Sequence, residues 1–134
     1  MRLVKFRGKP IQMTLPSREE LLGDFVVGNL ITHKDGVCRI LVPIDGGFEN
    51  YKVSPSTVSQ FTSLYDVSGK EIYEGDILDF NGLKIEVRFV RGVFALLCNG
   101  DLDNELCGDC RTDMFAKVIG NIHDNPELLK GGEE

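Results

Sequence analysis

The sequence has no tryptophan, only two histidines and no long apolar run. A helix that crosses a bilayer needs about 20 consecutive apolar residues, so the sequence excludes a membrane-spanning helix. The opening residues, MRLVKFRGKP, include basic residues but lack the apolar core of a secretory signal. We therefore expect a cytoplasmic protein with reduced thiols and no membrane partner.

An excess of positive charge is also missing, since 15 Lys and Arg stand against 21 Asp and Glu, for a net charge of −6. Proteins that bind nucleic acid gain affinity from clustered basic residues. The basic residues Arg2, Lys5, Arg7 and Lys9 fit the solvated face of a strand instead. For a macromolecular partner we therefore favour another protein over nucleic acid.

Motifs of common catalytic and metal sites are missing as well. The chain has no Gly-x-Ser-x-Gly motif, and Gly69-Lys70 is followed by Glu71, which rules out a Walker phosphate loop. A calcium loop starting at Asp101 fails, because its sixth and twelfth positions hold Leu106 and Thr112. We predict no catalytic, cofactor-binding or metal-binding residue, and we favour a binding protein over an enzyme.

The sequence has four cysteines, Cys38, Cys98, Cys107 and Cys110. Cys107 and Cys110 form a CxxC pair, which in other proteins binds zinc or performs thiol redox chemistry. A structural zinc site needs four ligands, so one pair is half a site, and a redox motif would need a βαβ context that this chain lacks. Whether Cys107 and Cys110 bind zinc stays open.

The region from Asp76 to Cys98 predicts two β-hairpins in one register. Asn81-Gly82 suits a two-residue turn in which both residues have positive φ, and Arg91-Gly92 is placed to form a second one. Directly opposite residues share a face of the sheet, so this register keeps one face apolar through both turns. The predicted pairs are Phe80 with Leu83, Asp79 with Lys84, Leu78 with Ile85, Phe89 with Phe94, Val87 with Leu96, and Ile85 with Cys98.

The rest of the chain is divided by turn residues into pieces that are mostly short or β-branched. We expect strands at residues 2–7, 25–31, 37–42, 51–53 and 115–122, and helical turns at 15–23 and 125–129. Many short strands at close spacing predict an all-β protein with small, SH3-like barrels and at most one or two helical turns. It would form a single unit, or two lobes at 1–64 and 65–125 followed by a tail at 126–134.

The stretch Gly69-Lys-Glu-Ile-Tyr-Glu-Gly-Asp-Ile77 gathers three carboxylates, Glu71, Glu74 and Asp76. Paired carboxylates can act as acid and base or bind a divalent cation. Asp76 and the nearby Asp79, however, would lie on opposite faces of one strand. Glu74-Gly75 is more simply a turn or bulge that leads into that strand, because glycine tolerates unusual φ angles.

Several motifs together resemble the YopX family, small proteins of bacteriophages and prophages. The core motifs are Val53-x-Pro55-x-Thr57-Val58-x-Gln60-Phe61-Thr62-x-Leu64-x-Asp66 and the stretch Gly69 to Ile77. The ends agree through Val4-Lys-Phe-Arg-Gly-Lys9, Phe25-Val-Val-Gly28 with Leu30, Val118-Ile-Gly-Asn-Ile122 and Asn125-Pro-Glu-Leu-Leu129. The resemblance implies an all-β fold with small barrel-like parts, and it supplies no catalytic residue.

The chain departs from the family pattern in two respects. The family often has glycine where Ser63 stands, so a turn there would differ. Residues 10–22 and the cysteine-bearing loop at 101–113 follow no family pattern, so the resemblance gives the CxxC pair no support.

These observations favour a phage or prophage accessory protein that binds a macromolecule in the cytoplasm of the bacterial host. An alternative is a metal-dependent hydrolase that uses Glu71, Glu74 and Asp76. A second alternative is a structural protein that assembles with itself through exposed strand edges. The sequence leaves the partner, any substrate, the oligomeric state and the stage of the phage cycle open.

Overall fold

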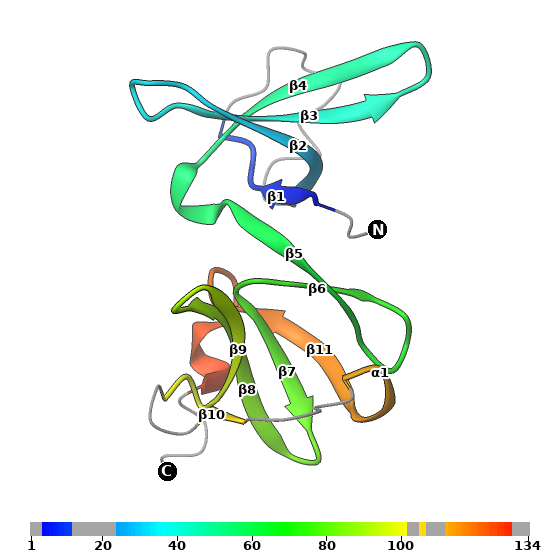
Figure 1. Ribbon diagram of the computed structural model, residues 1–134, viewed down its shortest axis with the longest axis vertical. Coiled ribbons are helices and arrows are strands. Elements are labelled where there is room, and N and C mark those ends of the chain that lie inside the picture. Colours follow the sequence, from blue (N-terminus) through cyan, green and yellow to red (C-terminus); the bar gives the residue numbers. More distant parts are fainter. Residues whose placement is uncertain (1–3, 12–23, 102–104, 107–111, 130–134) are drawn as a thin grey trace. The chain divides into compact units, whose positions relative to one another are not determined.

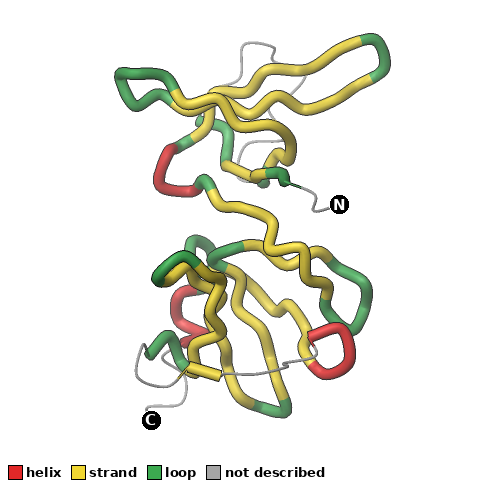
Figure 2. The backbone as a smooth tube through the Cα atoms, viewed as in Figure 1, coloured by secondary structure: helices red, strands yellow, loops and turns green. Residues whose placement is uncertain are grey.

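A computed structural model of the 134-residue chain describes residues 4–11, 24–101, 105–106 and 112–129. The described part is mostly strand, so the expected all-β class is confirmed (Figure 2). The strands are β1 (Phe6–Gly8), β2 (Val26–Thr32), β3 (Cys38–Ile44), β4 (Gly47–Val53), β5 (Ser59–Tyr65), β6 (Glu71–Tyr73), β7 (Asp76–Phe80), β8 (Leu83–Val90), β9 (Val93–Cys98), β10 (Glu105–Leu106) and β11 (Ala116–Asn121).

The chain divides into two compact units, Met1–Gln60 and Phe61–Glu134, which we call the N-terminal and C-terminal units. β5 runs across this boundary. Short helical segments occur at η2 (Pro55–Thr57), α1 (Thr112–Phe115) and η3 (Pro126–Leu129) (Figure 1). Of these described segments, η3 corresponds to the helical turn expected at 125–129, whereas η2 and α1 were not expected. The helical turn expected at 15–23 lies outside the described residues.

In the N-terminal unit, antiparallel strands follow the order β4-β3-β2-β1-β5. Alternate apolar residues of these strands face one buried cluster, formed by Val26, Cys38, Ile40, Tyr51 and Val53. Gly28 belongs to the segment that resembles the family, and a Cβ there would overlap the carbonyl oxygen of Leu41 on β3. Only glycine therefore allows β2 and β3 to approach this closely.

Two tight turns set the register of β2, β3 and β4. A turn at Lys34-Asp35-Gly36 joins β2 to β3, with the Gly36 N–H donating to the carbonyl of His33 at 3.0 Å. β4 starts earlier than expected, at Gly47, because Asp45 and Gly46 alone form the next turn and Ile44 pairs directly with Gly47. Gly46 has φ 82°, a conformation that favours glycine.

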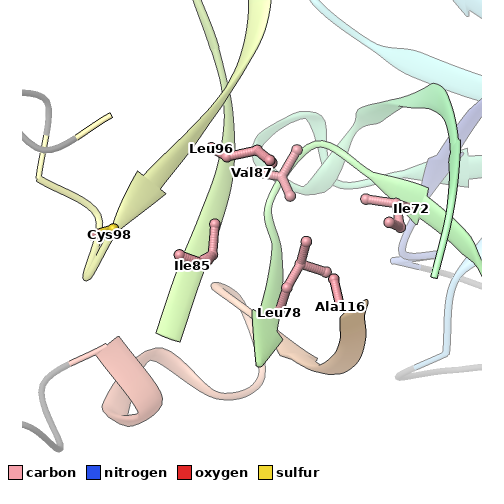
Figure 3. Close-up of a cluster of buried hydrophobic side chains, with 7 residues drawn as sticks. All are labelled: Ile72, Leu78, Ile85, Val87, Leu96, Cys98 and Ala116. Carbon is pink, nitrogen blue, oxygen red and sulfur yellow. The ribbon is translucent and has the colours of Figure 1, made fainter. Parts of the chain in front are cut away.

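The C-terminal unit contains an antiparallel sheet in the order β10-β9-β8-β7-β11. All six predicted cross-strand pairs occur in the β7–β8 and β8–β9 hairpins. Asn81, Gly82, Arg91 and Gly92 all have positive φ, as two-residue turns of this kind require. Five residues of the predicted apolar face, Leu78, Ile85, Val87, Leu96 and Cys98, form the core shown in Figure 3 together with Ile72 on β6 and Ala116 on β11.

The other face of this sheet is buried in part, which the hairpin pattern did not indicate. Ile77 and Leu97 point to that side, and both are 0% exposed. The 3-10 turn η3 lies against β8, and its Leu129 approaches Gly100, which follows β9. The second side of the sheet is thus covered near η3, while the Asp79–Lys84 ion pair on the same side is accessible to solvent.

The strand order of this sheet is open, with β10 and β11 at its edges, and no closed barrel is found among the described strands. The SH3-like barrel expected for this region is therefore not supported, although its hairpins are. β5 and β6 were not predicted as strands. Within the described residues, no helix combines the length and the apolar character that a membrane crossing requires.

Candidate functional site

Two of the three carboxylates of the stretch Gly69 to Ile77, those of Glu71 and Asp76, form hydrogen bonds within the local fold. Asp76 is 1% exposed, and one of its carboxylate oxygens accepts the backbone N–H of Tyr73 at 2.8 Å. Glu71 accepts the Tyr73 hydroxyl at 3.0 Å. Glu74 precedes Gly75, whose φ of 89° makes the bend that leads into β7. Asp76 thus stabilises the backbone around this bend by accepting a buried N–H.

A metal-dependent hydrolase would need these side chains to converge. Within the described part of the chain, which includes Glu71, Glu74 and Asp76, no group of three or more His, Cys, Asp or Glu could hold a metal ion. The structure therefore gives the hydrolase alternative no support. Cys107 and Cys110 lie outside the described residues, and Cys38 and Cys98 are buried free thiols.

Asp66, at the end of the first core motif, ties two segments of the C-terminal unit together. It is 3% exposed. Its carboxylate accepts backbone N–H groups of Ser68 and Lys70 in the following turn, and of Val118 on β11. Burial alone would raise the pKa of Asp66, but these three hydrogen bonds and the charge of Lys70 outweigh burial and lower it from 3.8. The carboxylate is therefore ionised at neutral pH as a backbone acceptor.

Thr62, also in the core motif, stabilises a bulge in β5. The register between β5 and β6 shifts between Phe61 and Leu64. The Thr62 hydroxyl donates to the carbonyl of Ile72 at 2.7 Å and accepts the N–H of Leu64 at 3.1 Å. Ser63, between them, has φ 70°, and its buried hydroxyl has no hydrogen-bond partner among the described residues. The bulge explains why glycine would suit this position.

Two further motifs close turns. In the N-terminal unit, the Thr57 hydroxyl donates to the carbonyl of Ser54 and accepts the N–H of Lys9. In the C-terminal unit, the side-chain oxygen of Asn125 accepts the N–H of Asn121 at 3.3 Å. A Cβ on Gly120 would lie 2.5 Å from that oxygen, so this turn requires glycine. These motif residues therefore specify the fold.

Residues 30–130 match the family described as YopX protein. The chain belongs to the YopX family. The match covers β3 to β9 and β11 completely, so it includes the motif residues of the C-terminal unit whose hydrogen bonds are given above. Those residues hold turns and a bulge, so membership of the YopX family accounts for the fold. It does not mark a site of action, which we look for on the surface.

A solved structure supports the same fold. The chain is similar to the crystal structure of protein EF1440 from Enterococcus faecalis, with a TM-score of 0.56 and 24% sequence identity. The similarity covers 95% of this chain and 98% of that one. At this identity it concerns the fold alone. Among curated proteins, none matches the sequence.

The N-terminal unit carries a solvent-facing surface that sequence reasoning missed. Two rows of directly paired residues cross β2, β3 and β4 on the side away from the buried cluster. We call these six residues the outer face: Ile31, Arg39 and Lys52 in one row, and Asn29, Leu41 and Asn50 in the other. All six are exposed or half-buried. Phe48, 57% exposed, continues the outer face along β4.

The charges on the outer face are of one sign. Arg39 on β3 lies directly opposite Lys52 on β4, and like charges in directly opposite positions destabilise a strand pair. Arg39 donates to the neutral side chain of Asn50 at 3.4 Å. Within the described residues, neither cation forms an ion pair with an acid. The nearby Glu49 lies on the other face of β4, where it accepts the Tyr51 hydroxyl.

The outer face could have been found from the sequence. With Asp45 and Gly46 as a two-residue loop, antiparallel pairing places residue 39 opposite residue 52. We instead expected a strand at residues 51–53 alone, which is too short to show that β4 begins at Gly47. Chemically, adjacent cations beside exposed apolar side chains can hold an anionic partner.

Proposed function

We propose that this YopX-family protein is a non-enzymatic accessory protein of a bacteriophage or prophage. In the host cytoplasm it binds another protein through the outer face of its N-terminal unit. The single observation that carries the proposal is the pairing of Arg39 with Lys52 on an exposed surface that offers them no acid among the described residues. Two like charges placed side by side favour binding of an opposite charge, because binding removes their mutual repulsion.

The composition of the outer face also supports a protein partner. Arginine and aromatic residues are enriched at protein interfaces. Arg39 lies between Ile31 and Lys52 within its row, and Phe48 extends the apolar surface towards the β3–β4 turn. Apolar and charged groups are thus close enough together for one partner to contact both. The proposal does not require the carboxylates Glu71 and Asp76, which accept hydrogen bonds within the fold.

The experiment compares three tagged proteins in extract of the bacterial host: the wild type, the double variant Arg39→Gln/Lys52→Gln, and the control Lys34→Gln. Lys34 lies in the exposed β2–β3 turn, outside the outer face. Retained proteins are identified by quantitative mass spectrometry, and the partner is then purified and titrated by calorimetry.

We expect one protein to bind the wild type and the Lys34→Gln control alike. The double variant should bind it at least about tenfold more weakly, since each hydrogen bond to a charged group contributes about 1.5–3 kcal/mol. If the wild type, the double variant and the control all bound that protein equally, the outer face would not be the binding surface. Retention of no protein by any of them would overturn the binding function itself.

A further inference from the structure

We infer that the outer face recognises an acidic protein segment that also presents apolar side chains. This inference rests on the proposed function, and it names the chemistry of the partner. Two properties of the outer face point to it: the cations Arg39 and Lys52 stand next to each other in one row, and Ile31 and Leu41 lie beside them as partly exposed apolar groups.

The paired cations specify a carboxylate. A carboxylate placed over the Arg39–Lys52 pair accepts hydrogen bonds from both, and Arg39 can offer a planar fork of donors. The remaining members of the two rows are neutral, so no acid of the outer face competes for that position. An anion at this place converts a repulsive pair into two attractive contacts.

The apolar residues of the outer face indicate that the partner carries apolar side chains beside its carboxylates. Ile31 is 40% exposed and adjoins Arg39 across the strands, while Leu41 lies on β3 two residues from Arg39 and shares its face. An extended segment whose acidic and apolar side chains stand two residues apart presents them on one face, so it can meet both kinds of group. Asn29 and Asn50 flank Leu41 in its row, and their side chains can form hydrogen bonds with neutral groups of the partner.

The distribution of charge along the chain directs an acidic partner to this unit. Residues 1–60 contain eight Lys and Arg against six Asp and Glu, whereas residues 61–134 contain seven against fifteen. The C-terminal unit therefore repels an acidic partner. Nucleic acid fits less well, because a phosphate backbone is held by a track of many cations and stacked aromatics. The outer face supplies two cations, and Phe48 is the aromatic beside it.

The test measures fluorescence anisotropy at low salt with a labelled peptide, Gly-Glu-Ser-Leu-Ser-Glu-Ser-Leu-Gly, whose Glu and Leu side chains lie on one face when the chain is extended. Matched probes are the same peptide with Gln for each Glu, the same peptide with Ser for each Leu, and labelled oligothymidylate of about twelve nucleotides. The proteins are the wild type, Arg39→Gln/Lys52→Gln and the control Lys34→Gln. Thermal unfolding of each variant verifies that it is folded, and light scattering reports whether the chain associates with itself.

We expect the Glu-Leu peptide to bind the wild type and Lys34→Gln equally. Loss of either the peptide carboxylates or the two cations should weaken binding by about tenfold or more. Loss of the leucines should weaken binding by more than a rise in salt concentration does. Equal binding of the Gln peptide would overturn the inference. So would tighter binding of oligothymidylate that depends on Arg39 and Lys52, or self-association that the double variant abolishes.

The two proposals can fail separately. If the Glu-Leu peptide does not bind, while a host protein still binds in a way that depends on Arg39 and Lys52, the acidic chemistry is wrong and the binding function stands. If the double variant changes neither the peptide titration nor the host-protein titration, both proposals are wrong.

Discussion

The carboxylate of Asp66 accepts the backbone N–H of Val118 at 3.0 Å, across 52 residues of sequence. Val118 lies on β11, which is an edge of the C-terminal sheet. Beside it, the N–H of Val67 donates to the carbonyl of Ala116. An edge strand with open N–H groups invites pairing with other chains, and here the segment around Asp66 occupies these positions. Asp66, a residue of the core motif, thus occupies a hydrogen-bonding position at the edge of the sheet.

Replacing Asp66 with alanine should destabilise the protein by about 3 kcal/mol or more. The change leaves three backbone N–H groups without their charged acceptor, and each such bond contributes about 1.5–3 kcal/mol in a buried setting. Urea unfolding measures the difference. The control Asp35→Ala removes a single exposed acceptor, for the N–H of Val37, and should cost about 1 kcal/mol or less. Equal losses in the two variants would contradict the assigned role of Asp66.

The stability of the protein should fall in acid partly through Asp66. Its folded-state pKa is lowered from 3.8, because three N–H donors and the charge of Lys70 outweigh burial. A lowered pKa stabilises the folded state at pH values above the unfolded pKa, and this contribution is lost as pH falls through the folded-state pKa. Unfolding free energies of the wild type and Asp66→Asn between pH 7 and pH 2.5 should therefore converge as the pH falls. A constant difference across this range would contradict the prediction.

The variant Ser63→Gly should be more stable than the wild type, by about 1 kcal/mol. Ser63 has φ 70° and a buried hydroxyl with no partner among the described residues. Glycine adopts this φ without strain and removes the hydroxyl, although the unfolded chain gains freedom that offsets part of the benefit. Urea unfolding checks the sign. Ser68→Gly, at an exposed position without positive φ, should bring no such gain. A loss of stability in Ser63→Gly would contradict this account of the bulge.

Mg²⁺ and Ca²⁺ should leave the melting temperature unchanged at millimolar concentration. A cation that binds the folded state alone raises stability by mass action, but Glu71, Glu74 and Asp76 belong to no three-ligand group in the described part of the chain. Differential scanning fluorimetry of the wild type, with and without each ion, checks this. An upward shift of the melting temperature that disappears in Glu71→Gln/Glu74→Gln would support the hydrolase alternative.

The hairpins of the C-terminal unit were predictable because local chemistry determines them. Asn81-Gly82 and Arg91-Gly92 fix two turns, and a one-residue slip would turn the apolar face to solvent. β5 and β6 were missed because the bulge at Ser63 breaks the alternation of β5 and leaves β6 only three residues long. Thr62 restores their pairing through a hydrogen bond to Ile72, ten residues away, which no local pattern reveals.

The remaining misses concern contacts between distant segments. Ile77 and Leu97 are buried on the second side of the sheet, and the distant C-terminal turn η3 lies against the neighbouring strand β8. The outer face depends on the loop length at Asp45-Gly46, where a change of one residue decides which side chain lies opposite Arg39. For the stretch Gly69 to Ile77, sequence reasoning favoured a turn over a catalytic site, and the contacts of Asp76 and Gly75 agree with a turn.

The central claim is that the core motifs maintain the fold while the outer face binds the partner. The most direct test follows backbone amide chemical shifts by NMR as the Glu-Leu peptide is added to the wild-type protein. We predict that the largest changes occur on β2, β3 and β4, around Ile31, Arg39 and Lys52, with little change between Glu71 and Asp76. Changes concentrated between Glu71 and Asp76, with the outer face unaffected, would contradict the claim.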